Sequence, residues 1–91
     1  MIIWSTPALL DLRAIDHWLS SNGTPSIATT TLTAIRARAN LLEHYPRIGR
    51  TGPGDSRILR VRRTPYLLFY RIAADRIEIL RIRHDREGWQ A

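Results

Sequence analysis

The chain has 91 residues and no cysteine, and its fourteen basic residues, all arginine, stand against eight acidic ones. This length suits one domain over residues 1–91, near the lower size limit for a self-sufficient hydrophobic core. Disulfide and thiolate chemistry are excluded, and no apolar run reaches the roughly 18–20 residues of a membrane span. The N-terminus lacks the basic and apolar segments of a secretion signal, so a cytoplasmic location without membrane contact is expected.

The excess of positive charge is the strongest global feature of the sequence. The net charge is +6 and the isoelectric point is near 11.3, and most of the arginines lie between Arg47 and Arg86. Such a charge favours an anionic partner, either nucleic acid or an acidic protein segment. The alternative is a basic surface that serves only solubility, and the clustering of the arginines argues against it.

The N-terminal half should contain a short strand followed by a first helix. The apolar run at 2–4 is long enough for a strand, and Thr6 is expected to cap a helix with Pro7 at its first position. A turn signal at 20–23 ends this helix, and Trp18 is expected to be a packing residue. Its apolar stripe at helical spacing consists of Ala8, Leu12, Ile15 and Leu19.

A second helix is expected to follow, with Ser26 as its N-cap and an end at 43–46. Its apolar stripe consists of Ala28, Leu32, Ile35, Ala39 and Leu42. Because short isolated helices are marginally stable in water, the two helices should form an antiparallel hairpin that packs on a sheet. The next segment, 47–56, is rich in glycine and lacks the pattern of a phosphate-binding loop, so it is predicted to be a mobile basic connector.

Three β-rich runs occupy the last third of the chain, at 57–63, 66–72 and 76–84, and short turn signals separate them. Consecutive runs of this kind predict an antiparallel meander. The fold class is therefore α+β. We expect a small antiparallel β-sheet in the order β-α-α-β-β-β, with the helical hairpin packed on one face.

Two-residue turns at 64–65 and 74–75 would fix which side chains share a face of this sheet. Arg71 would then lie opposite Glu78, and Phe69 would lie opposite both Leu80 and Arg60. The face toward the helices would consist of Leu59, Val61, Leu68, Tyr70, Ile72, Ile77 and Ile79. The outer face would mix apolar and guanidinium groups, namely Ile58, Arg60, Arg62, Leu67, Phe69, Arg71, Glu78, Leu80 and Ile82.

Several short motifs, each weak alone, become specific through their order and spacing. They are Trp4-Ser5 with Ala8, Asp11-Leu12 with Ile15, Pro46-x-x-Gly49-Arg50, Arg57-x-Leu59-x-Val61, Tyr66-x-x-x-Tyr70-Arg71-Ile72 and Ile77-x-Ile79-Leu80-x-Ile82-x-His84-x-Arg86-x-x-Trp89. With them the chain resembles the RelE/ParE superfamily of toxins from type II toxin–antitoxin modules. Its ending is more similar to the ParE-like, plasmid-stabilisation branch. The resemblance implies a growth inhibitor that forms a hetero-oligomer with a cognate antitoxin, through an acidic, partly disordered antitoxin segment.

The resemblance leaves two targets open. RelE-like toxins are ribosome-dependent messenger-RNA endoribonucleases, whereas ParE-like toxins poison DNA gyrase. The ribonucleases commonly carry an arginine soon after a tyrosine that opens a strand of the meander, and here Leu67 follows Tyr66. Because this cation is missing, gyrase is favoured, and the enzymatic alternative of a ribosomal endoribonuclease remains open. A non-catalytic nucleic-acid-binding domain is a second alternative, although no ribonucleoprotein motif or zinc-ligand spacing is present.

Candidate site residues follow from the charge pattern and from the resemblance. A ribonuclease would draw its catalytic groups from Arg60, Arg62, His84 and Arg86. A surface for the target or another anion would contain Arg60, Arg62, Arg81, Arg83, His84, Arg86 and Trp89. An antitoxin surface would contain Ile27, Thr31, Ala34, Arg38, Leu67 and Phe69. No cofactor is expected, and no metal site, because the histidines lack ligand spacing with carboxylates.

Two of these residues have structural alternatives. His84 is the best acid–base candidate, but a histidine at a strand end can instead close the strand by a hydrogen bond to backbone. Trp89 either pins the C-terminal tail to the sheet or contacts the target.

Overall fold

The computed structural model describes residues 1–86. Its elements are β1 (Ile2–Trp4), α1 (Thr6–Asn22), α2 (Pro25–Leu41), β2 (Arg50–Thr51), β3 (Arg57–Arg60), β4 (Tyr66–Ala73) and β5 (Arg76–His84). The predicted α+β class and element order are confirmed, with β2 as an additional short strand. No helix within residues 1–86 is long and apolar enough to cross a membrane.

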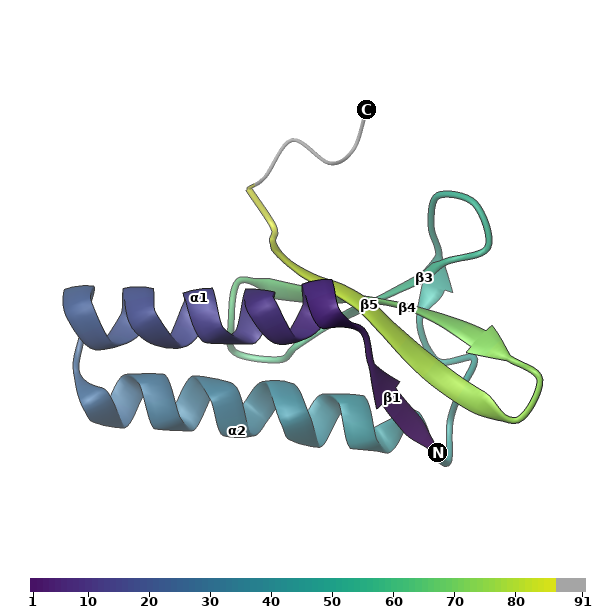
Figure 1. The fold of residues 1–91 in the computed structure, drawn as a ribbon, viewed down its shortest axis with the longest axis horizontal. Helices are drawn as coiled ribbons and strands as arrows, with labels where there is room; N and C mark the ends of the chain where they lie inside the picture. The colour runs from purple at the N-terminus through teal and green to yellow at the C-terminus, as the bar shows by residue number, and fades with distance from the viewer. Residues whose placement is uncertain (87–91) are drawn as a thin grey trace.

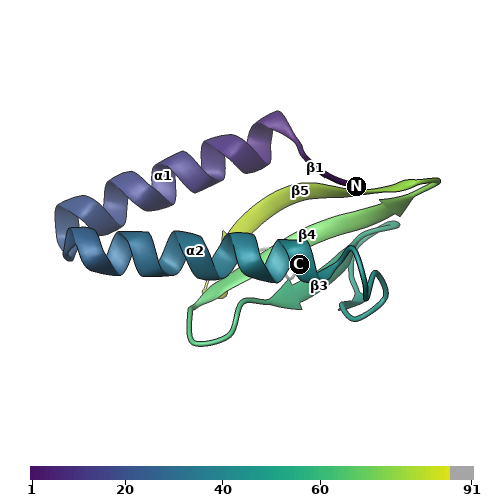
Figure 2. The ribbon, with the colours of Figure 1, turned by 90° about the horizontal axis from the view of Figure 1, so that it is seen from below.

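One five-stranded sheet forms a layer against which the helical hairpin packs (Figure 1). The strand order is β1-β5-β4-β3-β2. The meander is antiparallel as predicted, and β2 pairs antiparallel with β3, but β1 runs parallel to β5, so the complete sheet is mixed. Figure 2 shows both helices on one side of the sheet, with their connected end reaching beyond it.

The N-cap of α1 is Ser5, not Thr6. The Ser5 hydroxyl accepts a hydrogen bond from the Ala8 amide (3.1 Å) and donates one to the carbonyl of Leu80 in β5 (2.9 Å). Ser5 takes this position because β1 ends immediately before it, which leaves its backbone extended as a cap requires. The first turn then contains Thr6 and Pro7, where the missing proline N–H has no intrahelical partner to lose.

The N-cap of α2 also precedes the predicted residue. Thr24 Oγ1 accepts a hydrogen bond from the Ile27 amide (3.2 Å), so Ser26 lies inside the first turn and its prediction as cap is wrong. Pro25 decides this, because its fixed φ suits the first helical position and keeps the preceding residue extended. The predicted apolar stripes of both helices face the core: Leu19 and Leu32 are partly buried, and the fully buried members are Ala8, Leu12, Ile15, Ala28, Ile35, Ala39 and Leu42.

The main hydrophobic core lies between the hairpin and the sheet. Ile72 lies on the predicted side but at the edge of this core, beside Leu42 and Met1, and stays 39% exposed. On the outer face a smaller cluster joins Ile58, Leu67 and Phe69, with Leu80 packed against it. From the sheet and the position directly after β3, the main core contains Leu59, Val61, Tyr66, Leu68, Tyr70, Ile77, Ile79 and Ile82.

The β3–β4 connection is longer than the predicted two-residue turn. Residues 62–65 form it, and Arg63 adopts a left-handed conformation with φ of 65°. Arg60 consequently pairs with Leu67, and its predicted pairing with Phe69 is wrong. The partner of Arg60 moves by two positions, which preserves the two faces because side chains alternate with a period of two.

A β-bulge interrupts the pairing of β4 with β5. Phe69 pairs with Arg81 instead of Leu80, so Leu80 is an extra residue on β5. Beyond the bulge the alternation of β5 is reversed. Ile82, predicted on the outer face, therefore lies in the main core.

The β4–β5 turn agrees with the prediction. Ala73 pairs with Arg76 across a two-residue turn, and Arg71 pairs with Glu78. Arg71 Nε and Arg76 Nε donate hydrogen bonds to the two Glu78 oxygens at 2.5 and 2.9 Å. Both hydrogen bonds lower the pKa of the Glu78 carboxyl, and the bond from Arg71 has the larger effect.

The segment 47–56 is tied to the sheet, so the prediction of a mobile connector is wrong. Its strand β2 pairs with β3, and the buried Tyr70 hydroxyl donates to the Pro46 carbonyl (2.8 Å) and accepts from the Gly49 amide (2.9 Å). A Cβ at Gly49 would lie 2.6 Å from this hydroxyl oxygen, so only glycine fits without a shift. Burial of the phenol raises the pKa of Tyr70.

Candidate functional site

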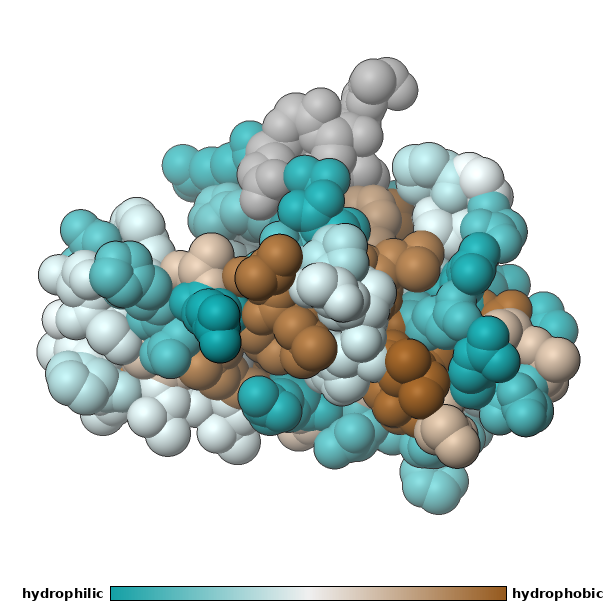
Figure 3. All heavy atoms as spheres, viewed as in Figure 1, coloured by the Kyte–Doolittle hydropathy of each residue, from teal (hydrophilic) through white to brown (hydrophobic). Residues whose placement is uncertain are grey.

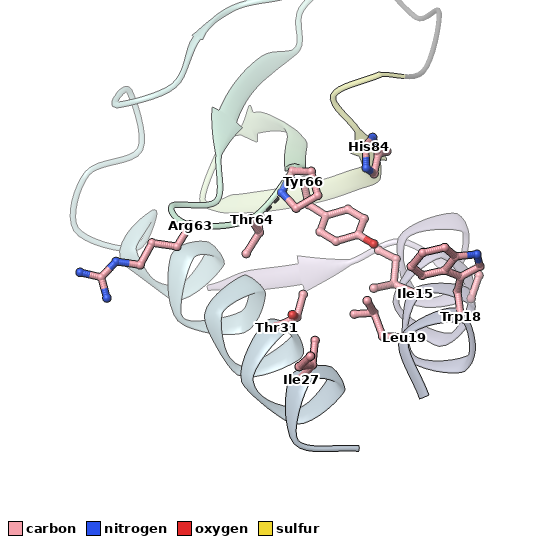
Figure 4. A pocket seen from close by; sticks show the side chains of 11 residues that line it. Ile15, Trp18, Leu19, Ile27, Thr31, Arg63, Thr64, Tyr66 and His84 are labelled. Atoms are coloured by element: carbon pink, nitrogen blue, oxygen red, sulfur yellow. Dashed lines mark hydrogen bonds between the residues drawn. The ribbon is translucent and has the colours of Figure 1, made fainter. Parts of the chain in front are cut away.

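An open groove of about 700 Å³ lies between the connected end of the helical hairpin and the β3–β4 turn. We call it the hairpin groove. In Figure 4 α1 and α2 form its two sides, the Tyr66 ring points between them, and His84 lies above α1. Its lining residues are Ala14, Ile15, Trp18, Leu19, Ile27, Thr31, Arg63, Thr64, Pro65, Tyr66 and His84. Most of these side chains are apolar, so the groove suits an apolar partner surface.

The groove exists because the hairpin reaches beyond the sheet that it covers (Figure 2). Trp18 is 59% exposed and Ile27 is 49% exposed, although both are large apolar side chains. Trp18 is therefore a groove residue, and its prediction as a packing residue is wrong. Exposed aromatic and aliphatic side chains at one groove indicate a surface that a partner covers.

A second apolar area lies on α1 outside the hairpin groove. The face shown in Figure 3 carries a band of hydrophobic side chains over α1, with hydrophilic ones around it. Leu9 and Leu10 are 50% and 55% exposed and line a depression of about 430 Å³ together with Arg13 and Arg36. We call this area the outer hairpin face.

His84 borders the hairpin groove and is bonded to its own chain neighbours. Its Nδ1 accepts a hydrogen bond from the Arg86 amide (3.1 Å) and lies 3.3 Å from a carboxylate oxygen of Asp85. Its ring contacts the Tyr66 ring edge-on, with the centroids 5.6 Å apart. The bond from the Arg86 amide ties the ring to the backbone at the end of β5. This geometry corresponds to the strand-closing alternative for His84.

The arginines beside Leu67 lie on the other face of the sheet from His84. Leu67 pairs with Arg60 on β3 and with Arg83 on β5, so the three side chains form one cross-strand row. His84 follows Arg83 on β5, and successive side chains of a strand point to opposite faces. Arg83 therefore points to the other face of the sheet from the candidate base, whereas Arg60 and His84 contact the two oxygens of the same Asp85 carboxylate, at 3.2 and 3.3 Å.

Arg60 and Arg81, two of the candidate arginines, bind carboxylates of the described residues. Arg60 Nη2 lies 3.2 Å from Asp85 Oδ2. Arg81 donates from Nε and Nη2 to the two oxygens of Asp11, at 2.8 and 3.0 Å, and the Ile82 amide donates to the same carboxylate at 2.8 Å. Asp11 is absent from the predicted site, although the sequence marks it as part of the Asp11-Leu12 motif, directly before an apolar stripe residue. Arg81 thus joins α1 to β5 and is not placed as an anion-binding residue.

The predicted antitoxin residues fall on two separate surfaces. The helix residues follow α2, first along the hairpin groove and then along an adjoining depression of about 240 Å³. The strand residues Leu67 and Phe69 lie in the outer-face cluster and are only 4% and 9% exposed. The helix residues are Ile27, Thr31, Ala34 and Arg38.

The remaining predicted residues lie at the chain end and at the β3–β4 turn. Arg62 and Arg86 are exposed and Arg83 is half-buried, while Trp89 lies outside the described residues. Within residues 1–86, no three histidine, cysteine or acidic side chains are placed to hold a metal ion.

Comparisons with known proteins agree with this fold. Residues 2–89 match the family described as ParE toxin of type II toxin-antitoxin system, parDE. The chain is 32% identical over 83 residues to Toxin RelE2 of Caulobacter vibrioides, an alignment that covers 91% of this chain and 92% of that protein. It is also similar to a solved structure of the chromosomal ParDE TA system from P. aeruginosa, with a TM-score of 0.83, 26% identity, and coverage of 91% of this chain and 92% of that one. This chain therefore belongs to the ParE toxin family of type II toxin–antitoxin systems.

Proposed function

We propose that this toxin arrests growth by acting on DNA gyrase. The family match extends over residues 2–89, and the ending of the chain resembles toxins that poison gyrase. The observation that carries this choice over a ribonuclease is Leu67, which is buried in an apolar cluster where related ribonucleases carry an arginine. A gyrase inhibitor needs a contact surface and does not depend on that cation.

RNA cleavage through the 2′-hydroxyl needs a base, an acid and cations around one phosphate. On this chain the imidazole of His84 borders the hairpin groove, and its Nδ1 already accepts the Arg86 amide. Leu67, where related ribonucleases carry an arginine, is 4% exposed and lies in an apolar cluster. Loss of one preorganised cation costs roughly 3 kcal/mol, or about a hundredfold in rate. These features support the non-nuclease choice.

The proposal is tested with purified gyrase. Toxin should inhibit DNA supercoiling or accumulate the cleaved gyrase–DNA complex, and pre-incubation with the cognate antitoxin should abolish either effect. The His84→Gln variant should inhibit as strongly as the wild type, because His84 has no chemical role in this proposal. Codon-specific messenger-RNA cuts on translating ribosomes, lost in His84→Gln while gyrase is unaffected, would establish the endoribonuclease instead.

The properties of the hairpin groove suit it to bind the antitoxin that neutralises the toxin. Exposed Trp18 and Ile27 offer apolar anchors, and Arg63 and Arg38 border the same strip along α2. An acidic, amphipathic segment that folds on binding would cover the anchors with its apolar side and meet the guanidinium groups with its carboxylates.

Two matched variants test this groove. Ile27→Glu places a carboxylate in the groove and should weaken antitoxin binding by at least about tenfold, or about 1.4 kcal/mol. Leu9 has nearly the same exposure, 50% against 49%, but lies on the outer hairpin face. Leu9→Glu should therefore change the affinity by less than about threefold. Equal losses in both variants, measured by isothermal titration calorimetry, would remove the hairpin groove from the interface.

A further inference from the structure

The positive charge of the molecule is concentrated where α2, the β3–β4 turn and the end of β5 lie together. Arg38 Nε donates to the Arg60 carbonyl (3.0 Å), and the Asp85 amide donates to the Pro65 carbonyl of the turn (2.7 Å), so contacts join the three elements. We call this region the basic end. Its six arginines are Arg38, Arg60, Arg62, Arg63, Arg83 and Arg86.

Carboxylates are scarce at the basic end. Of the described acidic side chains, Asp85 is the one that contacts an arginine there, 3.2 Å from Arg60. The other eight arginines share the rest of the described chain with six carboxylates. Several of those arginines are neutralised in ion pairs, such as Arg71 and Arg76 with Glu78. The basic end therefore holds most of the net charge of +6.

A closed turn supports the exposed arginines of the basic end. The Thr64 hydroxyl donates to the Val61 carbonyl (2.8 Å) and accepts from the Tyr66 amide (3.1 Å), which fixes the turn from inside. Arg62 and Arg63 are exposed on this turn, and the Arg63 side chain points away from the hairpin groove (Figure 4). The guanidinium groups are thus presented on a fixed backbone.

We infer that the basic end binds the phosphate backbone of duplex DNA. This deepens the proposed action on gyrase, whose substrate is duplex DNA, and rests on it for the choice of polyanion. The six arginines come from a helix, a turn and two strand ends, so they suit an extended partner with regular charge. Duplex DNA carries about one negative charge per 1.7 Å of axis. Guanidinium groups bind phosphate oxygens through paired N–H donors, without reading sequence.

The toxin alone should therefore bind a short duplex of mixed sequence, measured by fluorescence anisotropy. The logarithm of the association constant should fall linearly with the logarithm of the salt concentration. The triple variant Arg62→Gln/Arg63→Gln/Arg86→Gln removes three of the six guanidinium groups. It should weaken binding by more than about tenfold at low salt and make the salt slope shallower by roughly 2–3.

A matched triple variant removes the same charge elsewhere. Arg13, Arg36 and Arg47 are exposed and lie outside the basic end, so their replacement by Gln also removes three charges from the net +6. This control should keep its affinity for DNA within about threefold of the wild type and keep the salt slope. Equal losses in the two triple variants, or no DNA binding by the wild type at low salt, would overturn the site. Circular dichroism and thermal unfolding establish that each variant is folded.

The gyrase assay separates this site from the proposed target. The basic-end variant should lose gyrase inhibition, and the control variant should retain it. If wild type and both variants inhibit gyrase equally, the DNA site is wrong and gyrase remains the target. If the wild type binds DNA with the expected salt slope but leaves gyrase unaffected, the DNA site holds and the target is wrong. A basic-end variant that keeps DNA binding but loses antitoxin binding would assign the basic end to the acidic antitoxin and overturn the inference.

Discussion

Asp11 connects the first helix to the last strand through three hydrogen bonds. Its carboxylate accepts two from Arg81 and one from the Ile82 amide, between 2.8 and 3.0 Å, and its side chain is only 16% exposed. Removal of Asp11 takes an acceptor from both a guanidinium and a backbone amide. Removal of Arg81 leaves the bond between Asp11 and the Ile82 amide in place.

The two partners should therefore contribute unequally to stability. Asp11→Ala should lower the free energy of unfolding by about 2–3 kcal/mol, and Arg81→Ala by about 1 kcal/mol, because a half-buried amide loses its acceptor only in the first variant. Urea unfolding followed by circular dichroism measures both values. A larger loss for Arg81→Ala than for Asp11→Ala would contradict this assignment.

Tyr70 gives the fold a distinctive dependence on alkaline pH. Its pKa is raised by burial, so the folded chain keeps the phenol proton at pH values where the unfolded chain loses it. Below a pH of about 10, the neutral phenol makes its full contribution to the free energy of unfolding. This contribution decreases as the pH rises from there through the raised pKa of the folded chain. Tyr70→Phe removes this dependence.

Tyr70→Phe should cost about 1–3 kcal/mol near neutral pH, because Gly49 and Pro46 lose their side-chain hydrogen-bond partner. Above a pH of about 10 the difference in free energy of unfolding between the wild type and Tyr70→Phe should narrow. Only the wild type has a phenol that keeps its proton when folded and loses it when unfolded, which lowers its stability as the pH rises. Unfolding curves over an alkaline pH series measure the gap. A gap that widens with rising pH would show that the pKa of the buried phenol is not raised.

At the scale of the elements, the helix stripes and the Arg71–Glu78 pair could be predicted because they depend on local periodicity and on a two-residue turn. The bulge at Leu80 could not be predicted. Ile79 and Leu80 are both apolar, so period-two alternation cannot show which of them is extra. The contact seen next to the bulge, between Arg81 and Asp11, joins residues 70 positions apart.

The parts of the candidate site that depend on local spacing could be predicted from the sequence, and the parts that depend on tertiary packing could not. The four α2 residues at 27, 31, 34 and 38 share a helix face, so their common strip followed from spacing alone. The positions of Trp18 and Tyr66 in the groove walls could not be predicted from spacing, because the sequence does not show how far the hairpin reaches beyond the sheet. The predicted outer face is correct for Leu67 and Phe69, but both side chains are buried there in a second apolar cluster and are not exposed to a partner.

The cap of α1 offers a direct comparison between two adjacent side chains. Ser5→Ala removes both the cap of the Ala8 amide and the bond to Leu80, so it should lower the free energy of unfolding by about 1–2 kcal/mol. Thr6→Ala, at the cap position expected from the sequence, should change it by less than about 0.5 kcal/mol. Differential scanning calorimetry measures both, and the reverse order would return the cap to Thr6.

At the scale of the whole molecule, the hairpin groove and the basic end meet at the β3–β4 turn. Arg63 belongs to both, because it lies at the rim of the groove, with its side chain directed away from it, and is one of the six arginines. An acidic antitoxin segment in the groove would bring its carboxylates next to the basic end. We therefore expect one bound segment to cover the apolar anchors and to oppose the binding of any other polyanion, which would couple neutralisation to loss of target contact.

The choice of target is tested most directly in growing cells by inducing the toxin without its antitoxin and labelling DNA synthesis and protein synthesis separately. Action on gyrase predicts that DNA synthesis stops first, while amino-acid incorporation continues and ribosome-bound messenger RNA stays intact. The His84→Gln variant should produce the same order of events. If protein synthesis stops first, with messenger RNA cut at defined codon positions, the toxin is a ribosomal endoribonuclease and gyrase is not its target.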